Sequence, residues 1–80
     1  MNIGEASRKR ILELCAEKNM SINKLATLSG ITQSTLNNIV SGRNKSTTVS
    51  TVKKLCDGLN ITIIEFFNTD YFVNLDQEIK

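Results

Sequence analysis

The sequence predicts an all-α domain built from five short helices. Apolar residues recur at helical spacing in most of the chain, and glycine or asparagine marks each break between such stretches. The chain has 80 residues, of which 40% are hydrophobic, so it holds enough apolar material for one small core. We expect one domain, residues 1–68, followed by a C-terminal tail, residues 69–80.

The first two predicted helices are separated by a short break. The first runs from about residue 4 to residue 18, with its inward stripe at Ile11, Leu14 and Cys15. Asn19 is expected to end this helix in the left-handed conformation. Ser21 is the predicted N-cap of the second helix. The inward positions of that helix are Ile22, Leu25, Ala26 and Ser29.

The turn after the second helix comprises only Ser29, Gly30 and Ile31. Ile31 is expected to point inward, and Thr32 is the predicted N-cap of the third helix. A connection this short makes the two helices cross steeply rather than run antiparallel. The second and third helices are therefore predicted to form a helix-turn-helix.

Two more helices are predicted beyond the third, which runs from residue 33 to about residue 41 and stops at Gly42. A polar loop follows over residues 43–47. Thr48 is expected to cap a fourth helix that Asn60 ends. The predicted inner face of this helix consists of Val49, Val52, Leu55, Cys56 and Leu59. A short, very apolar fifth helix spans residues 62–67.

Charge is unevenly distributed along the chain. Residues 1–54 hold nine Lys and Arg against three Glu, a net +6, and residues 55–80 hold one Lys against five Asp and Glu, a net −4. No acid occurs between Glu17 and Asp57, a stretch that contains the six cations Lys18, Lys24, Arg43, Lys45, Lys53 and Lys54. Carboxylates would repel phosphates, so this pattern favours a surface that faces nucleic acid over an ordinary solvated face.

The third predicted helix has an uncharged polar face opposite Leu36, Ile39 and Val40. Asn and Ser are poor helix formers, and an inert solvated face usually carries Lys and Glu. Gln and Asn pair bidentately with adenine, and Ser bonds several base edges, so we predict that this face reads bases in the DNA major groove. The predicted base contacts are Gln33, Ser34, Asn37 and Asn38. Just past the helix, the predicted phosphate contacts are Arg43, Asn44 and Lys45.

These residues resemble a known family. The spacing of Leu25, Ala26, Gly30, Ile31, Leu36 and Ile39 is similar to that of the lambda-repressor-like (Cro/cI, or xenobiotic-response-element) helix-turn-helix family. In that pattern Ala26 is the small residue where the two helices touch, Gly30 makes the turn, and the large apolar residues are buried beneath it. Residues 32–35 resemble the usual start of the recognition helix, and residues 48–67 resemble the closing helices.

The resemblance implies a five-helix domain that binds double-stranded DNA as a homodimer and regulates transcription, most often as a repressor. It places Gln33, Ser34 and Asn38 at bases, and Asn37 close to either bases or backbone. Near the backbone it places Thr32, Thr35, Arg43 and Lys45. It implies no cofactor, metal ion or small-molecule effector pocket, and the expected location is the bacterial cytoplasm.

The chain departs from the family pattern in three places, one of which is a loop after Gly42 that is about two residues longer than in the shortest members. A glutamine that often begins the second helix is Ile22 here, which leaves its phosphate contact to Asn23 or Lys24. An Arg–Glu pair that often joins the first and third helices is replaced by Cys15 and Val40. Because both replacements are apolar, no buried charge is left unpaired.

The C-terminal part of the chain is crowded with apolar residues. Within residues 61–73 these are Ile61, Ile63, Ile64, Phe66, Phe67, Tyr71, Phe72 and Val73. A core this small cannot bury all of them, so two arrangements remain open. The segment folds onto its own domain, or part of it forms a dimer contact.

Catalysis, metal binding and membrane insertion are not predicted. The chain has no histidine, and it shows no nucleophile–base pair or glycine-rich phosphate loop. Cys15 and Cys56 lie on apolar stripes without CxxC spacing, so reduced core thiols are favoured over a disulfide. No segment is long enough to span a membrane. The alternative function is a helix-turn-helix module that binds a protein partner or RNA.

Overall fold

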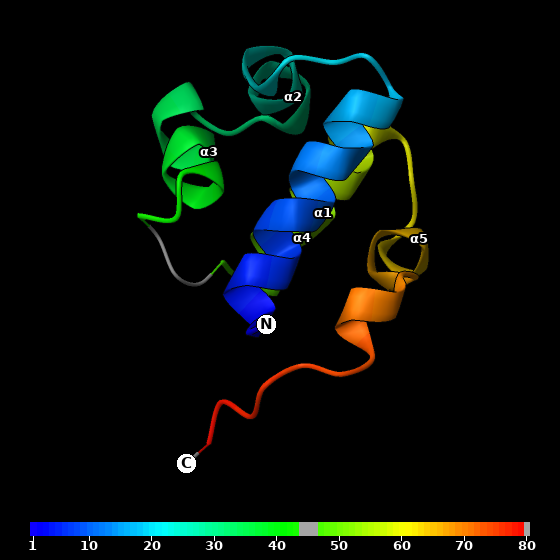
Figure 1. Cartoon of the computed structure of the whole chain (residues 1–80). Helices are drawn as coiled ribbons and strands as arrows, with labels where there is room; N and C mark the ends of the chain where they lie inside the picture. Colours follow the sequence, from blue (N-terminus) through cyan, green and yellow to red (C-terminus); the bar gives the residue numbers. More distant parts are fainter. Residues whose placement is uncertain (44–46, 80) are drawn as a thin grey trace.

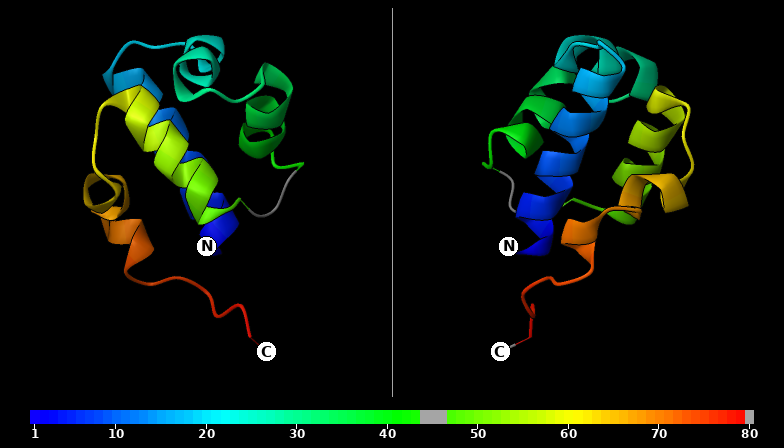
Figure 2. Two further views of the ribbon diagram at one scale, coloured as in Figure 1. Left: turned by 180° about the vertical axis from the view of Figure 1, so that it is seen from behind. Right: turned by 45° about the vertical axis from the view of Figure 1, so that its right-hand side comes forward.

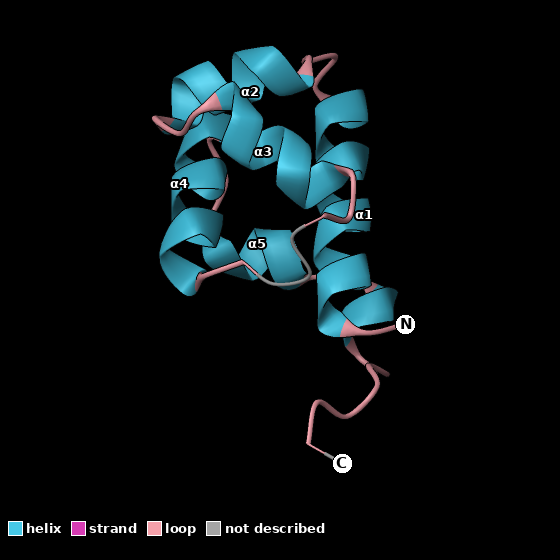
Figure 3. Ribbon diagram, turned by 90° about the vertical axis from the view of Figure 1, so that its left-hand side faces the viewer, coloured by secondary structure: helices cyan, strands magenta, loops and turns pink. Residues whose placement is uncertain are grey.

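The computed structural model describes residues 1–43 and 47–79, and every regular element within them is a helix, as predicted. The elements are α1 (Ile3–Glu17), α2 (Ile22–Ser29), α3 (Gln33–Val40), α4 (Val49–Leu59), α5 (Ile63–Phe67) and the 3₁₀ helix η1 (Asp70–Phe72). Helix α2 lies across one end of the pair α1 and α4, with α3 on one side of this pair and α5 on the other (Figure 1). Viewed from the side of α3, helices α1 and α4 stand apart (Figure 3).

Local capping sets the helix ends. The predicted N-caps Ser21, Thr32 and Thr48 are confirmed, since each side-chain oxygen accepts a hydrogen bond from the backbone amide three residues on. Asn19 and Asn60 have the left-handed conformation expected of them, with φ of 52° and 58°. The prediction missed the reciprocal cap at the start of α1, where Asn2 and Glu5 bond each other's backbone amides. Thr62 forms the same motif with Glu65 at the start of α5.

A single apolar cluster joins the five α-helices. Its buried members are Ile11, Leu14, Cys15, Leu25, Ala26, Leu36, Ile39, Val52, Leu55, Cys56, Leu59 and Phe66. The predicted inner face of α4 is correct except at Val49, which is 76% exposed. Val49 shares the stripe of Val52, but it is the first residue of α4. The first turn of α4 extends beyond the apolar core, so Val49 does not pack against the core residues. Helical spacing alone therefore predicts its burial wrongly.

The C-terminal segment packs largely on its own domain. Phe66 is fully buried, and Phe67 and Phe72 pack against the core. The Tyr71 hydroxyl donates a hydrogen bond to the Glu13 carboxylate of α1 at 3.2 Å. Further along, the backbone amide of residue 76 donates to the carbonyl of residue 1 at 3.1 Å. The first of the two arrangements left open by the sequence therefore holds for most of this segment, although Ile64, Val73 and Ile79 stay more than 70% exposed.

The described helices contain no segment both long and apolar enough to cross a membrane. Likewise, the described side chains form no group of three Cys, Asp or Glu that would hold a metal ion.

Helices α2 and α4 cross closely at Gly58. A Cβ atom added to Gly58 would lie 2.3 Å from Oγ of Ser29 and 3.1 Å from its backbone nitrogen. The Ser29 hydroxyl is buried and has no hydrogen-bond partner among the described residues. The crossing therefore requires a residue without a side chain on α4, and it leaves a polar atom unpaired on α2.

Ser29→Ala is expected to raise the free energy of unfolding by about 1 kcal/mol, because it removes an unpaired buried hydroxyl and introduces a better helix former. Gly58→Ala should cost about 1 kcal/mol more in the wild type than in the Ser29→Ala background, where Oγ no longer blocks the new Cβ. Urea unfolding of the four proteins measures both effects. Ser50→Ala, an exposed serine of α4, is the matched control. Additive changes at 29 and 58 would contradict the interpretation.

Candidate nucleic-acid interface

The helix-turn-helix is held by the residues that the sequence pattern singled out. Leu25 and Ala26 of α2 are fully buried, as is Leu36 of α3, and Ile39 is 6% exposed. Ile31, in the turn, is half-buried and packs against the same core. Gly30 ends α2 with a left-handed φ of 70°. One stripe of α3 is thereby buried, and its other side is left at the surface (Figure 3).

The outer side of α3 presents polar groups with open hydrogen-bonding capacity. Gln33, Ser34 and Asn37 are exposed, and Asn38 is half-buried. None of these four side chains forms a hydrogen bond with another described residue; the side-chain bonds at α3 involve its caps and Ser41 only. Amides and hydroxyls in this state can bond base edges without first breaking an internal contact.

The start of α3 is also suited to an anion. The Thr32 hydroxyl accepts a hydrogen bond from the backbone amide of Thr35 at 3.1 Å and lies 2.7 Å from the Thr35 hydroxyl. The first-turn amides of Gln33 and Ser34 have no helical partner. No acidic residue occurs in this first turn, so the partial positive charge of the helix end is not neutralised.

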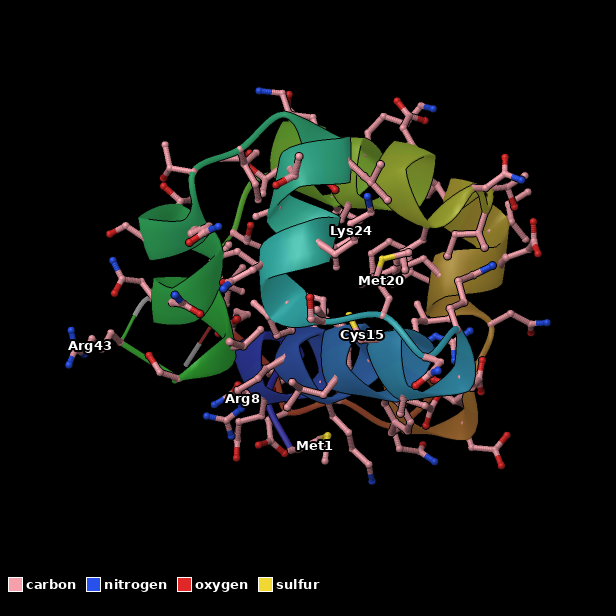
Figure 4. All side chains as sticks on the ribbon, turned by 90° about the horizontal axis from the view of Figure 1, so that it is seen from above. Met1, Arg8, Cys15, Met20, Lys24 and Arg43 are labelled. Atoms are coloured by element: carbon pink, nitrogen blue, oxygen red, sulfur yellow. The ribbon has the colours of Figure 1, made fainter. Side chains whose placement is uncertain are left out.

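Two arginines from outside α3 lie near its other end. Gly42 ends the helix with φ of 85°, and Arg43 follows it, exposed and pointing away from the body of the protein (Figure 4). Arg8 of α1 lies on the same side (Figure 4), and its Nη1 atom is 2.6 Å from the position that a Cβ of Gly42 would occupy. Nothing in the sequence pattern marked Arg8 as part of this site. The predicted contacts Asn44 and Lys45 lie outside the described residues.

Part of the acidic region of the chain lies away from α3. Helix α5 is on the opposite side of α1 and α4 from α3, whereas the tail runs beneath the bundle to the start of α1, where Asp76 pairs with the N-terminal amine (Figures 1 and 2). The acidic region carries Glu65, Asp70, Asp76 and Glu78. The uncharged outer face of α3 and the two arginines therefore lie on the side of the molecule away from α5 (Figures 1 and 4).

The cysteines belong to the core and not to the site. Cys15 and Cys56 are free and buried, as predicted. Burial raises the pKa of both thiols, which keeps them protonated at neutral pH. Val40, which stands opposite Cys15 in the family's Arg–Glu positions, is half-buried against the same core.

Comparison with known proteins defines the class to which this site belongs. The family model of the Cro/C1-type HTH DNA-binding domain matches residues 10–70, so the chain belongs to that family and carries a DNA-binding domain. The protein is similar to the crystal structure of the prophage Lp1 protein 11, with a TM-score of 0.81 and 36% sequence identity. The match covers 94% of the present chain and 100% of the prophage protein chain. No curated protein matches the chain.

Proposed function

We propose that the protein is a sequence-specific transcriptional regulator that reads duplex DNA with α3 in the major groove. The observation that carries the proposal is the exposed, uncharged face of α3, where Gln33, Ser34 and Asn37 keep their hydrogen-bonding groups open. Family membership supports duplex DNA as the partner. The proposed backbone contacts are Thr32, Thr35, Arg43, Asn44 and Lys45, which would set the register on the DNA.

We further propose that two copies bind one two-fold symmetric site and act as a repressor. A dimer of helix-turn-helix domains reads half-sites about one helical turn apart, on one face of the duplex. The exposed side chains of Ile64 and Val73, with exposed fractions of 81% and 75%, support a contact through the C-terminal segment, tail residues 69–80 included. Repression follows where the occupied site overlaps a promoter, because bound protein excludes polymerase.

Selection from a pool of random duplexes tests the reading face. The wild type is expected to enrich a symmetric site. Gln33→Ala combined with Asn37→Ala should lose the enrichment, at about 1–3 kcal/mol of discrimination for each bidentate contact removed. This variant should keep its salt-dependent binding to arbitrary duplexes, because the phosphate contacts are intact. Sedimentation of the complex with the enriched duplex should show two chains per duplex.

The control removes two exposed polar side chains outside α3 and outside the proposed dimer contact. Glu17→Ala combined with Lys18→Ala alters exposed residues at the end of α1 without changing the net charge and should leave the enriched sequence unchanged. If no duplex is enriched even at low salt, the proposal is wrong. The helix-turn-helix would then serve the alternative function, binding of a protein partner or RNA. One chain per duplex would overturn the dimer alone.

A further inference from the structure

We propose that Arg8 of α1 is a further DNA-phosphate contact, and that Gly42 is required to let its guanidinium reach the end of α3. This inference rests on the proposed function and adds to it a residue outside the helix-turn-helix. It joins two positions that are 34 residues apart in the sequence but adjacent in the fold.

The close approach of Arg8 to Gly42 shows where the Arg8 guanidinium lies. Nη1 of Arg8 lies 2.6 Å, and Cζ 3.8 Å, from the point that a Cβ at residue 42 would occupy. Any side chain there would displace the guanidinium. Gly42 also has φ of 85°, which disfavours other residues. Glycine at residue 42 thus has two roles. It allows the left-handed conformation that ends α3, and it leaves space for the Arg8 guanidinium.

The charge of Arg8 is available to a ligand. Its side chain is half-buried, and the ion pairs of the described residues join other groups. The neighbouring cation, Lys9, lies instead over the Tyr71 ring, 5.0 Å from its centroid, and so belongs to the η1 side of α1. A guanidinium beside the end of the reading helix, on the side of the exposed Arg43, is well placed for a bidentate phosphate contact.

A competing role for Arg8 is purely structural. A cation near the last carbonyls of α3 interacts favourably with the helix dipole. This role predicts a lower urea midpoint for a neutral variant and no specific change in salt dependence. The phosphate role predicts an unchanged urea midpoint and a weaker salt dependence of DNA binding for the neutral variant. The two measurements therefore distinguish the two roles.

The test is DNA binding of the full chain by Arg8→Gln across a salt series, with the duplex enriched by the wild type and with one arbitrary duplex. The slope of log affinity against log salt should fall by about 1 for each chain bound. Between about 50 and 200 mM salt the wild type should therefore lose about 3-fold more affinity than the variant for each chain bound. Arg8→Lys should retain most of the slope, and base preference should not change.

Two further variants complete the experiment. Lys9→Gln removes the same charge one residue along α1 and should leave the slope unchanged. Gly42→Ala should lower the slope as Arg8→Gln does, with no further fall in the double variant. If the slope of Arg8→Gln equals that of the wild type, or if Lys9→Gln lowers it equally, the inference is wrong while the proposed function stands. A wild type that binds no duplex overturns both.

Discussion

Phe66→Ala is expected to lower the free energy of unfolding by about 3–5 kcal/mol. Phe66 is fully buried although α5 is only five residues long, and its ring packs against those of Phe67 and Phe72 at centroid distances of 4.9 and 6.2 Å. Truncation leaves a cavity that a close-packed core fills only partly. A domain of this length is stable by about 4–12 kcal/mol in total, so the loss is a large fraction of it.

Urea unfolding followed by circular dichroism measures this change. Val49→Ala is the control, because Val49 is also an apolar helical residue but is 76% exposed. Its effect should stay within about 0.5 kcal/mol. Similar losses for the two variants would show that α5 is not anchored through Phe66.

Arg10→Met is expected to lower the free energy of unfolding by about 2–4 kcal/mol. Arg10 is only 9% exposed; it joins α1 to the end of α5 through two hydrogen bonds and also pairs with Glu13 of its own helix. Its Nε and Nη2 atoms donate hydrogen bonds to the carbonyls of Phe66 and Glu65, both at 2.7 Å, and Nη1 pairs with Glu13. Methionine fills the space but removes the side-chain donor from both carbonyls, and the Glu65 carbonyl keeps only the long bond from the Asn68 amide, at 3.4 Å.

Thermal unfolding gives a second measure, since each 1 kcal/mol shifts the midpoint by about 4–8 °C in a domain of this size. Lys18→Met, at the exposed end of α1, controls for loss of a charge and should have little effect. Arg10→Lys should recover only part of the loss, because an ammonium lacks the planar fork of donors that reaches both carbonyls and Glu13. A midpoint unchanged in Arg10→Met would contradict the role assigned to this residue.

The predictions that held concern local structure. Ser21, Thr32 and Thr48 cap their helices because a short hydroxyl side chain bonds an amide three residues on, whatever the rest of the chain does. The composition of the outer face of α3 is likewise a property of helical spacing. Family membership was predictable for a related reason, since the turn at Gly30 and the buried positions around it have a spacing that few other folds require.

What the sequence placed wrongly or left open concerns depth and distant neighbours. Spacing places Val49 on the right stripe but does not show where the core ends. Five of the seven residues 61–67 are apolar, so periodicity could not separate the buried Phe66 from the exposed Ile64. An arginine in an amphipathic helix usually extends into solvent, and nothing in the sequence marked Arg10 as an exception.

The sequence alone therefore determined the helices, three of their N-caps, the helix-turn-helix and the polar face of α3, because each depends on residues a few positions apart. Only the tertiary structure decided which C-terminal side chains are buried, that Arg10 holds α5 across 56 residues of sequence, and that Arg8 lies beside Gly42. These contacts depend on how α1 packs against elements that follow it much later in the chain. Such packing is a property of the whole core, and no local pattern encodes it.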